Sequence, residues 1–262
     1  MGIARTRHTP DRSKIPLPCD DGRQEVFCPI HRRIGTITVK LVIFDFDGTL
    51  VDSRKLIIES NRVVFGQFGF AMPSEDESLS LVGMSLELVL LQLAGPDAPV
   101  EKMVAAYRRL LPLLRADAAY AEVPFGGAAD LLTALAERND VRLGIATGHV
   151  SHAIEPALER FGWHSHFCTV QTADKAPSKP HPGMVLQALS EANVEAKDAI
   201  MIGDTAFDIE MARAAGVRGV AVSWGYHSPD RLHGAGASRV VNDMSELRDC
   251  LFEAISSASR EL

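Results

Sequence analysis

Two acidic residues, Asp45 and Asp47, stand two positions apart directly after a run of apolar residues. In an extended chain, residues two apart point to the same side, so both carboxylates are expected at one site. Neighbouring carboxylates raise each other's pKa unless a cation lies nearby, and Mg²⁺ prefers oxygen ligands. Gly48 allows a sharp turn after the pair. The sequence therefore predicts a carboxylate site with a hard cation, and the alternative is a pair of turn-forming acids.

A second pair of acids, Asp204 and Asp208, follows another apolar run at residues 200–202. If a helix begins just after Asp204, the two residues lie on one face of it, because they are four positions apart. The alternative is a capping Asp followed by a surface Asp. Two acid pairs, each at the end of an apolar strand, favour a shared site more strongly than either pair alone.

Thr147 and Gly148 end a third apolar run. The threonine hydroxyl and the backbone amides that follow it are suited to bind phosphate oxygens. Lys179 lies between prolines just before a predicted helix and is a candidate site residue, with Lys175 as a nearby competitor. The alternative is a lysine solvated on its loop. The sequence thus combines carboxylates, a hydroxyl and an ammonium group at strand ends.

The elements that position these residues alternate along the chain. Short apolar runs, typical of strands buried on both faces, occupy residues 41–44, 141–146, 199–202 and 219–222. Between them lie segments whose apolar residues recur at helical spacing. This alternation predicts an α/β fold, a doubly wound parallel sheet with a Rossmann-like core. In such folds the ligand site lies beyond the carboxyl ends of the strands.

Residues 53–124 interrupt this alternation with four successive helical segments. Helices that are apolar on one side need partners, so the segment is predicted to form a small helical bundle inserted after the first strand. We expect a core of residues 39–52 and 125–262 and a cap of residues 53–124 that acts as a lid. Asn61 interrupts the apolar stripe of the first cap helix and is predicted to contact the substrate; the alternative is an asparagine at the edge of the bundle.

Composition excludes several function classes. The chain has 262 residues with 27 Lys plus Arg, 34 Asp plus Glu and a formal net charge of −7, which argues against broad binding of nucleic acid or anionic membranes. It has no apolar run long enough to span a membrane. The four cysteines lack paired spacing, which favours a reducing, cytoplasmic location.

Residues 1–38 differ from the rest. They are rich in proline and basic residues and show no sustained apolar period, which predicts a disordered N-terminal extension. No apolar segment typical of a signal peptide is present, so export is not expected. An alternative hypothesis places the translation start near Val39, where the strand pattern begins.

Taken in order, residues 45–50 (DFDGTL), Thr147, Lys179 and residues 203–208 (GDTAFD) resemble the four motifs of the haloacid dehalogenase superfamily. The resemblance covers about residues 40–262, and its closest form is the branch with a helical cap, the phosphoglycolate phosphatase-like group. It implies hydrolysis of a small phosphorylated molecule, with phosphoglycolate as a candidate.

The resemblance also implies residue roles. Asp45 attacks phosphorus to form an aspartyl-phosphate, and Asp47 acts as general acid and then as general base. Catalysis also involves Lys179. Mg²⁺ is implied as the cofactor, held by Asp45, the backbone carbonyl of Asp47, Asp204 and Asp208. Phosphate oxygens are implied to contact Thr147, Gly148 and Lys179.

Individual residues argue for or against the activities of related enzymes. A dehalogenase does not need an acid at position 47, so Asp47 favours phosphate chemistry. Phosphonate-cleaving relatives use a cap lysine, and residues 53–101 offer only Lys55. Sugar phosphomutases carry basic cap residues where residues 81–87 here are mainly apolar. A sugar phosphomutase, a pyrophosphatase and a non-catalytic phosphate-binding protein stay open as alternatives, and the oligomeric state is not predicted.

Overall fold

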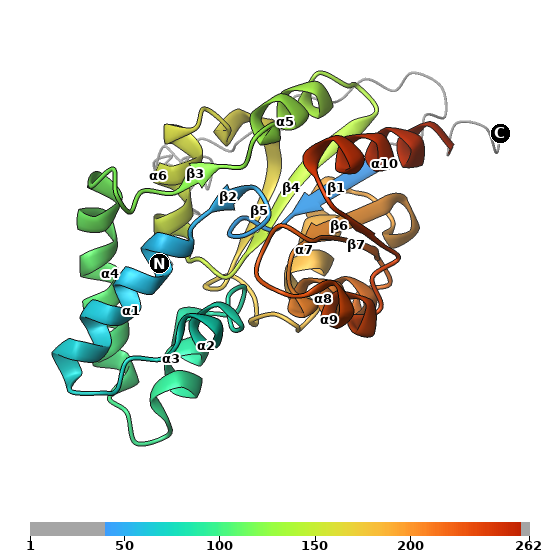
Figure 1. The fold of residues 1–262 in the computed structure, drawn as a ribbon. Coiled ribbons are helices and arrows are strands. Elements are labelled where there is room, and N and C mark those ends of the chain that lie inside the picture. Colours follow the sequence, from blue (N-terminus) through green and yellow to red (C-terminus); the bar gives the residue numbers. More distant parts are fainter. Residues whose placement is uncertain (1–39, 258–262) are drawn as a thin grey trace, which may run out of the picture. The chain divides into compact units, whose positions relative to one another are not determined.

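The computed structural model describes residues 40–257 of the chain, so the N-terminal extension predicted at residues 1–38 lies outside the described part. Six parallel strands form the central sheet in the order β5-β4-β1-β6-β7-β8 (Figure 1). The strands are β1 (Lys40–Phe44), β4 (Val141–Thr147), β5 (Phe167–Thr172), β6 (Ala199–Gly203), β7 (Arg218–Val222) and β8 (Arg239–Val241). The predicted doubly wound parallel sheet is confirmed.

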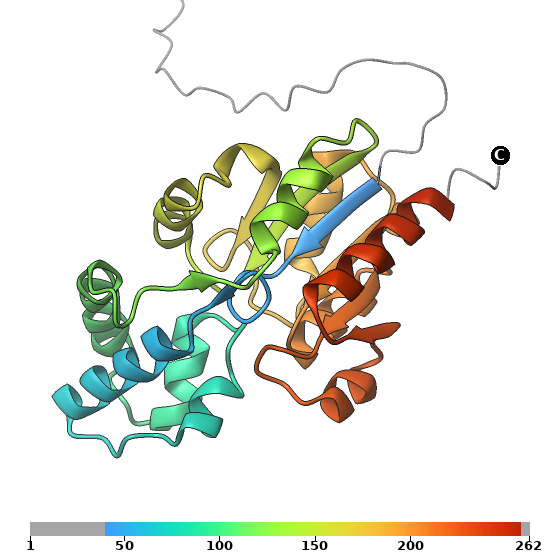
Figure 2. The same cartoon turned by 45° about the horizontal axis from the view of Figure 1, so that its top comes forward.

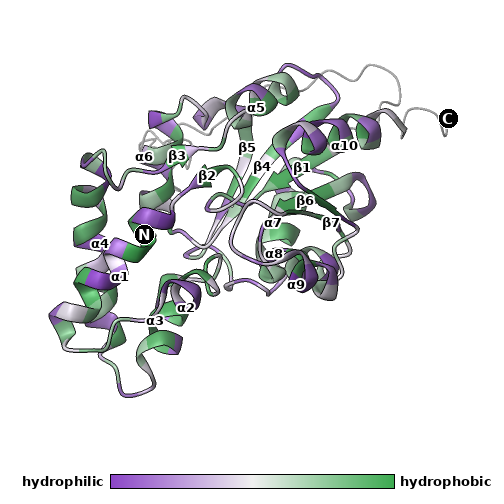
Figure 3. Cartoon of the chain, viewed as in Figure 1, coloured by the Kyte–Doolittle hydropathy of each residue, from purple (hydrophilic) through white to green (hydrophobic). Residues whose placement is uncertain are grey.

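The strands follow the hydrophobic pattern of the sequence. Residues 41–44 of β1 are buried throughout, and Figure 3 shows the central strands in the hydrophobic colour. A strand covered by helices on both faces needs apolar residues at every position. The sequence did not indicate β5, which contains Thr169, Gln171 and Thr172, or β8, which is only three residues long.

Helices cover both faces of the sheet. Side chains of α5 (Ala128–Ala136), α6 (Ser151–Arg160) and α10 (Met244–Ser257) share one hydrophobic cluster with β1, β4 and β6. Side chains of α7 (Gly183–Ala192) and α8 (Ala206–Ala214) form the cluster on the opposite face. Figure 2 shows α5 and α10 on the same side of the sheet. Helix α9 (Pro229–Ala235) packs against α8, and short 3₁₀ turns occupy His164–His166 and Ala196–Asp198.

A group of helices is inserted after β1. It consists of α1 (Arg54–Phe68), α2 (Glu75–Leu79), α3 (Leu86–Ala94) and α4 (Val100–Ala116), in agreement with the helical insertion predicted from the sequence. These helices bury a hydrophobic cluster of their own that includes Phe65, Leu90 and Met103. The chain enters and leaves the insertion through β2 (Val51–Asp52) and β3 (Val123–Pro124), which pair in antiparallel fashion. We call α1–α4 the helical insertion.

The strand order determines where a ligand site can form. From β1 the sheet grows through β4 and β5 in one direction and through β6, β7 and β8 in the other. Neighbouring strands β1 and β6 therefore lie where the winding reverses, and ligands of such sheets bind outside the carboxyl ends of the strands at this point. None of the helices within residues 40–257 is both long enough and apolar enough to cross a membrane.

Candidate active site

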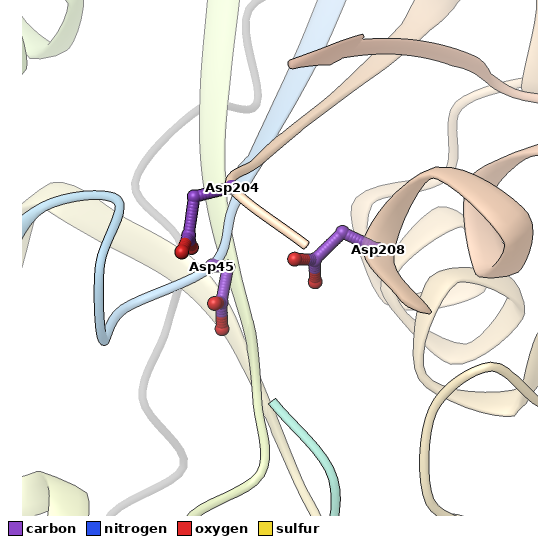
Figure 4. A group of neighbouring side chains, drawn as sticks. All are labelled: Asp45, Asp204 and Asp208. Carbon is purple, nitrogen blue, oxygen red and sulfur yellow. The ribbon is translucent and has the colours of Figure 1, made fainter. Parts of the chain in front are cut away.

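Three buried carboxylates meet at the carboxyl ends of β1 and β6 (Figure 4). Asp45 directly follows β1, Asp204 directly follows β6, and Asp208 lies in the first turn of α8. One carboxylate oxygen from each of the three lies within 4.8 Å of the others. The structure thus brings together three of the acids that the sequence predicted at one site.

Asp204 is held by hydrogen bonds from two other segments. The Thr49 hydroxyl donates to Asp204 Oδ1 at 2.9 Å, and the Tyr226 amide donates to Asp204 Oδ2 at 2.8 Å. A side chain at Gly48 or Gly225 would collide with the Asp204 carboxylate. Both glycines are therefore required for the close approach of their loops, and Thr49 and Tyr226 are site residues for which the sequence had predicted no role.

Asp208 is oriented by the first turn of its own helix. The Thr205 amide and hydroxyl donate to Asp208 Oδ2 at 3.1 Å and 2.7 Å, and this capping interaction leaves Oδ1 for Lys179, whose Nζ lies 2.6 Å away. Lys179 is fully buried and also lies 2.6 Å from Asp45 Oδ1. The competing Lys175 is exposed and donates to the Val170 carbonyl, so the structure brings Lys179 to the carboxylates.

The charges of this cluster suit a divalent cation. Burial raises the pKa of Asp204, and the nearby Asp45 and Asp208 raise it further. Burial likewise raises the pKa of Asp45, although the Lys179 ammonium opposes the shift. Asp45 Oδ2 is buried and accepts no hydrogen bond from the described residues. Three carboxylates facing one ammonium group leave an excess of negative charge, so Asp45, Asp204 and Asp208 form a set of oxygen ligands that fits Mg²⁺.

Asp47 belongs to a separate group beside the carboxylate cluster. The Ser53 hydroxyl donates a short hydrogen bond to Asp47 Oδ1, and His149 Nε2 lies 2.7 Å from Asp47 Oδ2. Burial alone would raise the pKa of Asp47, but the His149 charge and hydrogen bonds from His149 and Ser53 lower it to about 2. The side chain of Asp47 is thus outside the set of three carboxylates, and the proposed metal contact of its backbone carbonyl stays a prediction.

Thr147 and Gly148 lie at the end of β4. Thr147 is buried, and its hydroxyl accepts a hydrogen bond from the His149 amide at 3.2 Å. A Cβ atom at position 148 would lie 2.8 Å from the Gly83 carbonyl oxygen and closer still to that of Met84. Glycine at position 148 therefore allows direct backbone contact between the core and the loop that joins α2 and α3.

Asn61 is buried on α1 and lines a cavity of about 110 Å³ together with Asp47, Gly148 and His149. The structure therefore brings the insertion residue that the sequence singled out to the same cavity as the predicted acid. Ser53 and His149, which contact Asp47, had no assigned catalytic role. His149 directly follows Gly148, which is the signal that could have pointed to it, whereas no spacing rule points to Ser53.

Comparison with known proteins agrees with this arrangement. Residues 42–222 match the family model described as haloacid dehalogenase-like hydrolase. The chain is 34% identical over 213 residues to "Probable phosphatase IndB" of Dickeya dadantii, an alignment that covers 79% of this chain and 91% of that protein. It is 28% identical over 221 residues to "Phosphoglycolate phosphatase" of Agrobacterium fabrum, covering 83% and 94% of the two chains.

A solved structure of a hydrolase from Pseudomonas syringae is also similar, with a TM-score of 0.72 and 25% identity, covering 82% of this chain and 98% of that one. The family match and the relatives named as phosphatases support an enzyme that hydrolyses phosphoric monoesters. Because the family model spans most of the chain, this protein belongs to the haloacid dehalogenase-like hydrolase family.

Proposed function

We propose that the protein is a Mg²⁺-dependent phosphatase that hydrolyses a small phosphomonoester through an aspartyl-phosphate on Asp45. The observation that carries this proposal is the different environment of the two carboxylate oxygens of Asp45. Its Oδ1 is held by Lys179 at 2.6 Å, whereas its Oδ2 is buried without a hydrogen-bond partner in residues 40–257. A fixed carboxylate with one oxygen free to react is what a nucleophile requires.

The phosphoryl group would lie between Asp45 and the end of β4. Thr147 and the amide of Gly148 would hold two of its oxygens, and the Lys179 ammonium would offset charge on the oxygens that do not leave. Buried donors fixed before the reaction need no reorganisation when charge develops, which is the physical reason for their effect on rate.

Asp47 would transfer the protons. It would protonate the leaving oxygen, and after the alcohol departs it would accept a proton from the water that attacks the aspartyl-phosphate. The contacts with His149 and Ser53 hold Asp47 ionised, which is the form needed for the second step. For the first step the negative charge of a bound phosphate raises the pKa of a neighbouring carboxyl and favours its protonation.

Asp45, Asp204 and Asp208 would hold Mg²⁺, with the backbone carbonyl of Asp47 as a further oxygen ligand. When bound, the cation supplies charge that reduces the repulsion between the attacking carboxylate and the phosphate. The cofactor assignment is supported by the excess of carboxylate over ammonium groups in the cluster.

Phosphoglycolate is one candidate substrate, because relatives from Agrobacterium fabrum and Rhodospirillum rubrum carry that name. Phosphoryl transfer between sugars and pyrophosphate cleavage would use the same residues, so both are outcomes of the test below. A protein that only binds phosphate would need no proton-transfer residue beside the nucleophile.

The test measures phosphate release with Mg²⁺ from phosphoglycolate, sugar phosphates, nucleotides, acetyl phosphate and pyrophosphate. Asp45→Asn keeps the size of the side chain but removes the nucleophile, so we expect activity to fall by about 10³-fold or more. Asp97→Asn is the matched control, since Asp97 is exposed in the insertion. Turnover that survives Asp45→Asn would refute the covalent mechanism, and bound phosphate ester recovered unchanged from the wild type would favour a binding protein.

A further inference from the structure

The cavity beside Asp47 has mainly apolar walls. It lies where the helical insertion meets the core and has a volume of about 110 Å³. Its apolar walls come from α1, α3, α4 and the loop between α2 and α3, and include Leu56, Ile57, Val82, Met84, Val89 and Leu111. A group bonded to the phosphate would extend from Asp47 into this cavity.

The charged groups on the cavity wall are already paired. Among the described residues that line the cavity, the basic side chains are Arg108 and His149. Arg108 Nη2 lies 2.7 Å from Glu87 Oε1, and His149 Nε2 lies 2.7 Å from Asp47 Oδ2. A carboxylate that entered the cavity would therefore leave water without gaining an unpaired cation, which is costly.

Two residues that line the cavity, Asn61 and Ser78, each carry a buried polar atom without a hydrogen-bond partner among residues 40–257. Asn61 and Ser78 are each only 1% exposed, and neither Asn61 Nδ2 nor Ser78 Oγ makes a hydrogen bond to any residue of the described range. Buried donors are normally satisfied, so these two atoms indicate that a ligand or water supplies an acceptor. The cavity thus combines a large apolar surface with two buried polar groups, one from α1 and one from α2, that are open to a ligand.

We propose that this cavity selects phosphomonoesters whose alcohol part is short, uncharged and mainly apolar, with one hydrogen-bond acceptor for Asn61. This inference rests on the proposed phosphatase function. A cavity of about 150 Å³ holds benzene, so the present volume corresponds to roughly four or five non-hydrogen atoms. Phosphoglycolate fits by size, but its carboxylate meets apolar walls and paired charges.

The first experiment compares kcat/KM for ethyl, propyl and butyl phosphate with that for phosphoglycolate, using acetyl phosphate as a small reference substrate. We expect a rise of about fourfold per added methylene, which corresponds to about 0.8 kcal/mol of apolar burial. A higher kcat/KM for phosphoglycolate than for butyl phosphate would overturn the inference. Turnover of acetyl phosphate without any chain-length dependence would overturn it while leaving the phosphatase function intact.

Binding provides a readout that does not need turnover. Pentylphosphonate and 3-phosphonopropanoate are non-hydrolysable analogues of butyl phosphate and phosphoglycolate, and calorimetry with Mg²⁺ compares their affinities. Tighter binding of pentylphosphonate would support the inference about the cavity even if no ester is hydrolysed. In that case only the proposed phosphatase function would be refuted. Equal or weaker binding of pentylphosphonate would overturn the inference.

Two variants of α3 distinguish an effect on the cavity from a general effect on the helical insertion. Val89 lines the cavity, whereas the adjacent Leu88 is 40% exposed and does not. Val89→Asp should lower the ratio of kcat/KM for butyl phosphate to that for acetyl phosphate by about tenfold or more, because a carboxylate enters the apolar wall. Leu88→Asp should keep this ratio within about twofold. An unchanged ratio in Val89→Asp would refute the assignment of the cavity.

The acceptor contact is tested with two substrates of equal length. Butyl phosphate and 2-methoxyethyl phosphate have the same number of non-hydrogen atoms but differ by one ether oxygen. Asn61→Leu removes the buried donor, so kcat/KM for 2-methoxyethyl phosphate relative to butyl phosphate should fall by about fivefold. If the relative value does not fall, Asn61 does not recognise the substrate.

Discussion

Lys179 offers the sharpest test of the site's electrostatics. Its fully buried ammonium group lies 2.6 Å from Asp45 Oδ1 and 2.6 Å from Asp208 Oδ1. Lys179→Met removes the charge but keeps an unbranched side chain that packs in apolar surroundings. Breaking a buried ion pair by removing one partner typically costs about 3–5 kcal/mol, because the other charge stays buried without compensation. We expect a loss of this size in the metal-free protein above neutral pH.

The stability lost in Lys179→Met should increase as the pH rises. Burial raises the pKa of Asp45 to about 7 in the folded protein, and removal of Lys179 raises it further. A carboxyl with a raised folded-state pKa binds its proton more tightly when folded, so its favourable contribution is complete below its unfolded pKa and is lost as pH rises through the folded value. The variant should therefore be closest to the wild type near about pH 4 and most destabilised above about pH 7.

Mg²⁺ should reverse part of the loss. A cation that binds the folded protein but not the unfolded chain stabilises it by about 2.7 kcal/mol at a concentration of 100 times the dissociation constant. In the variant the cation also supplies positive charge where Lys179 stood, so the gain on adding Mg²⁺ should be larger than in the wild type if its affinity is maintained.

Urea unfolding measures these effects in chelator and in Mg²⁺, at about pH 4.5 and about pH 8. Lys175→Met is the matched control, because Lys175 lies in the same loop but is exposed. A loss below about 1 kcal/mol at the higher pH, or an equal loss at both pH values, would show that Lys179 does not hold two buried carboxylates together.

Further predictions concern proton transfer and the contact between core and insertion. Asp47→Asn should lower kcat by about 10²–10⁴-fold, and a loss below about tenfold in steady-state assays would remove Asp47 from proton transfer. Gly148→Ala should lower the free energy of unfolding by about 1–3 kcal/mol, because a Cβ atom there collides with backbone of the insertion. Gly126→Ala, where a Cβ atom meets no atom within 4 Å, serves as its control in the same urea titrations. His227→Phe should cost about 1–3 kcal/mol, since it removes contacts to Ala206 and Ser80, and an unchanged urea midpoint would contradict this role.

The carboxylate cluster was predictable because its residues lie at element boundaries. Asp45 and Asp204 end apolar strands, and the carboxyl ends of parallel strands lie at one edge of a sheet. The sequence did not reveal that β1 and β6 are direct neighbours, because the two strands are far apart along the chain. Asp204 and its hydrogen-bond partner Thr49, for example, are separated by 155 positions. Adjacency of distant strands depends on how helices pack on both faces, which local pattern does not specify.

The environment of Asp47 could not be predicted in the same way. Asp45 and Asp47 were expected to share one site, but their side chains contact different groups. Ser53 reaches Asp47 because a bridge between Val51 and Asp47 folds the chain back at this point, and His149 reaches it from just beyond the end of β4. Both contacts depend on the path of a loop, and neither residue type is diagnostic at its position.

Residues within or beside the motifs make the contacts between the core and the helical insertion. The backbone at Gly148 touches the loop between α2 and α3, and the Ser178 hydroxyl accepts a hydrogen bond from the Ser85 amide at 2.7 Å. His227 accepts from the Ala206 amide through Nδ1, so its Nε2 carries the proton donated to the Ser80 carbonyl at 2.9 Å. The loops after β4 and β5 thus contact the insertion at Gly148 and beside Lys179. The loop after β7 contacts it through His227, next to Tyr226, whose amide donates to Asp204. We therefore expect that a change in the position of the insertion would also move the groups that we assign to the reaction.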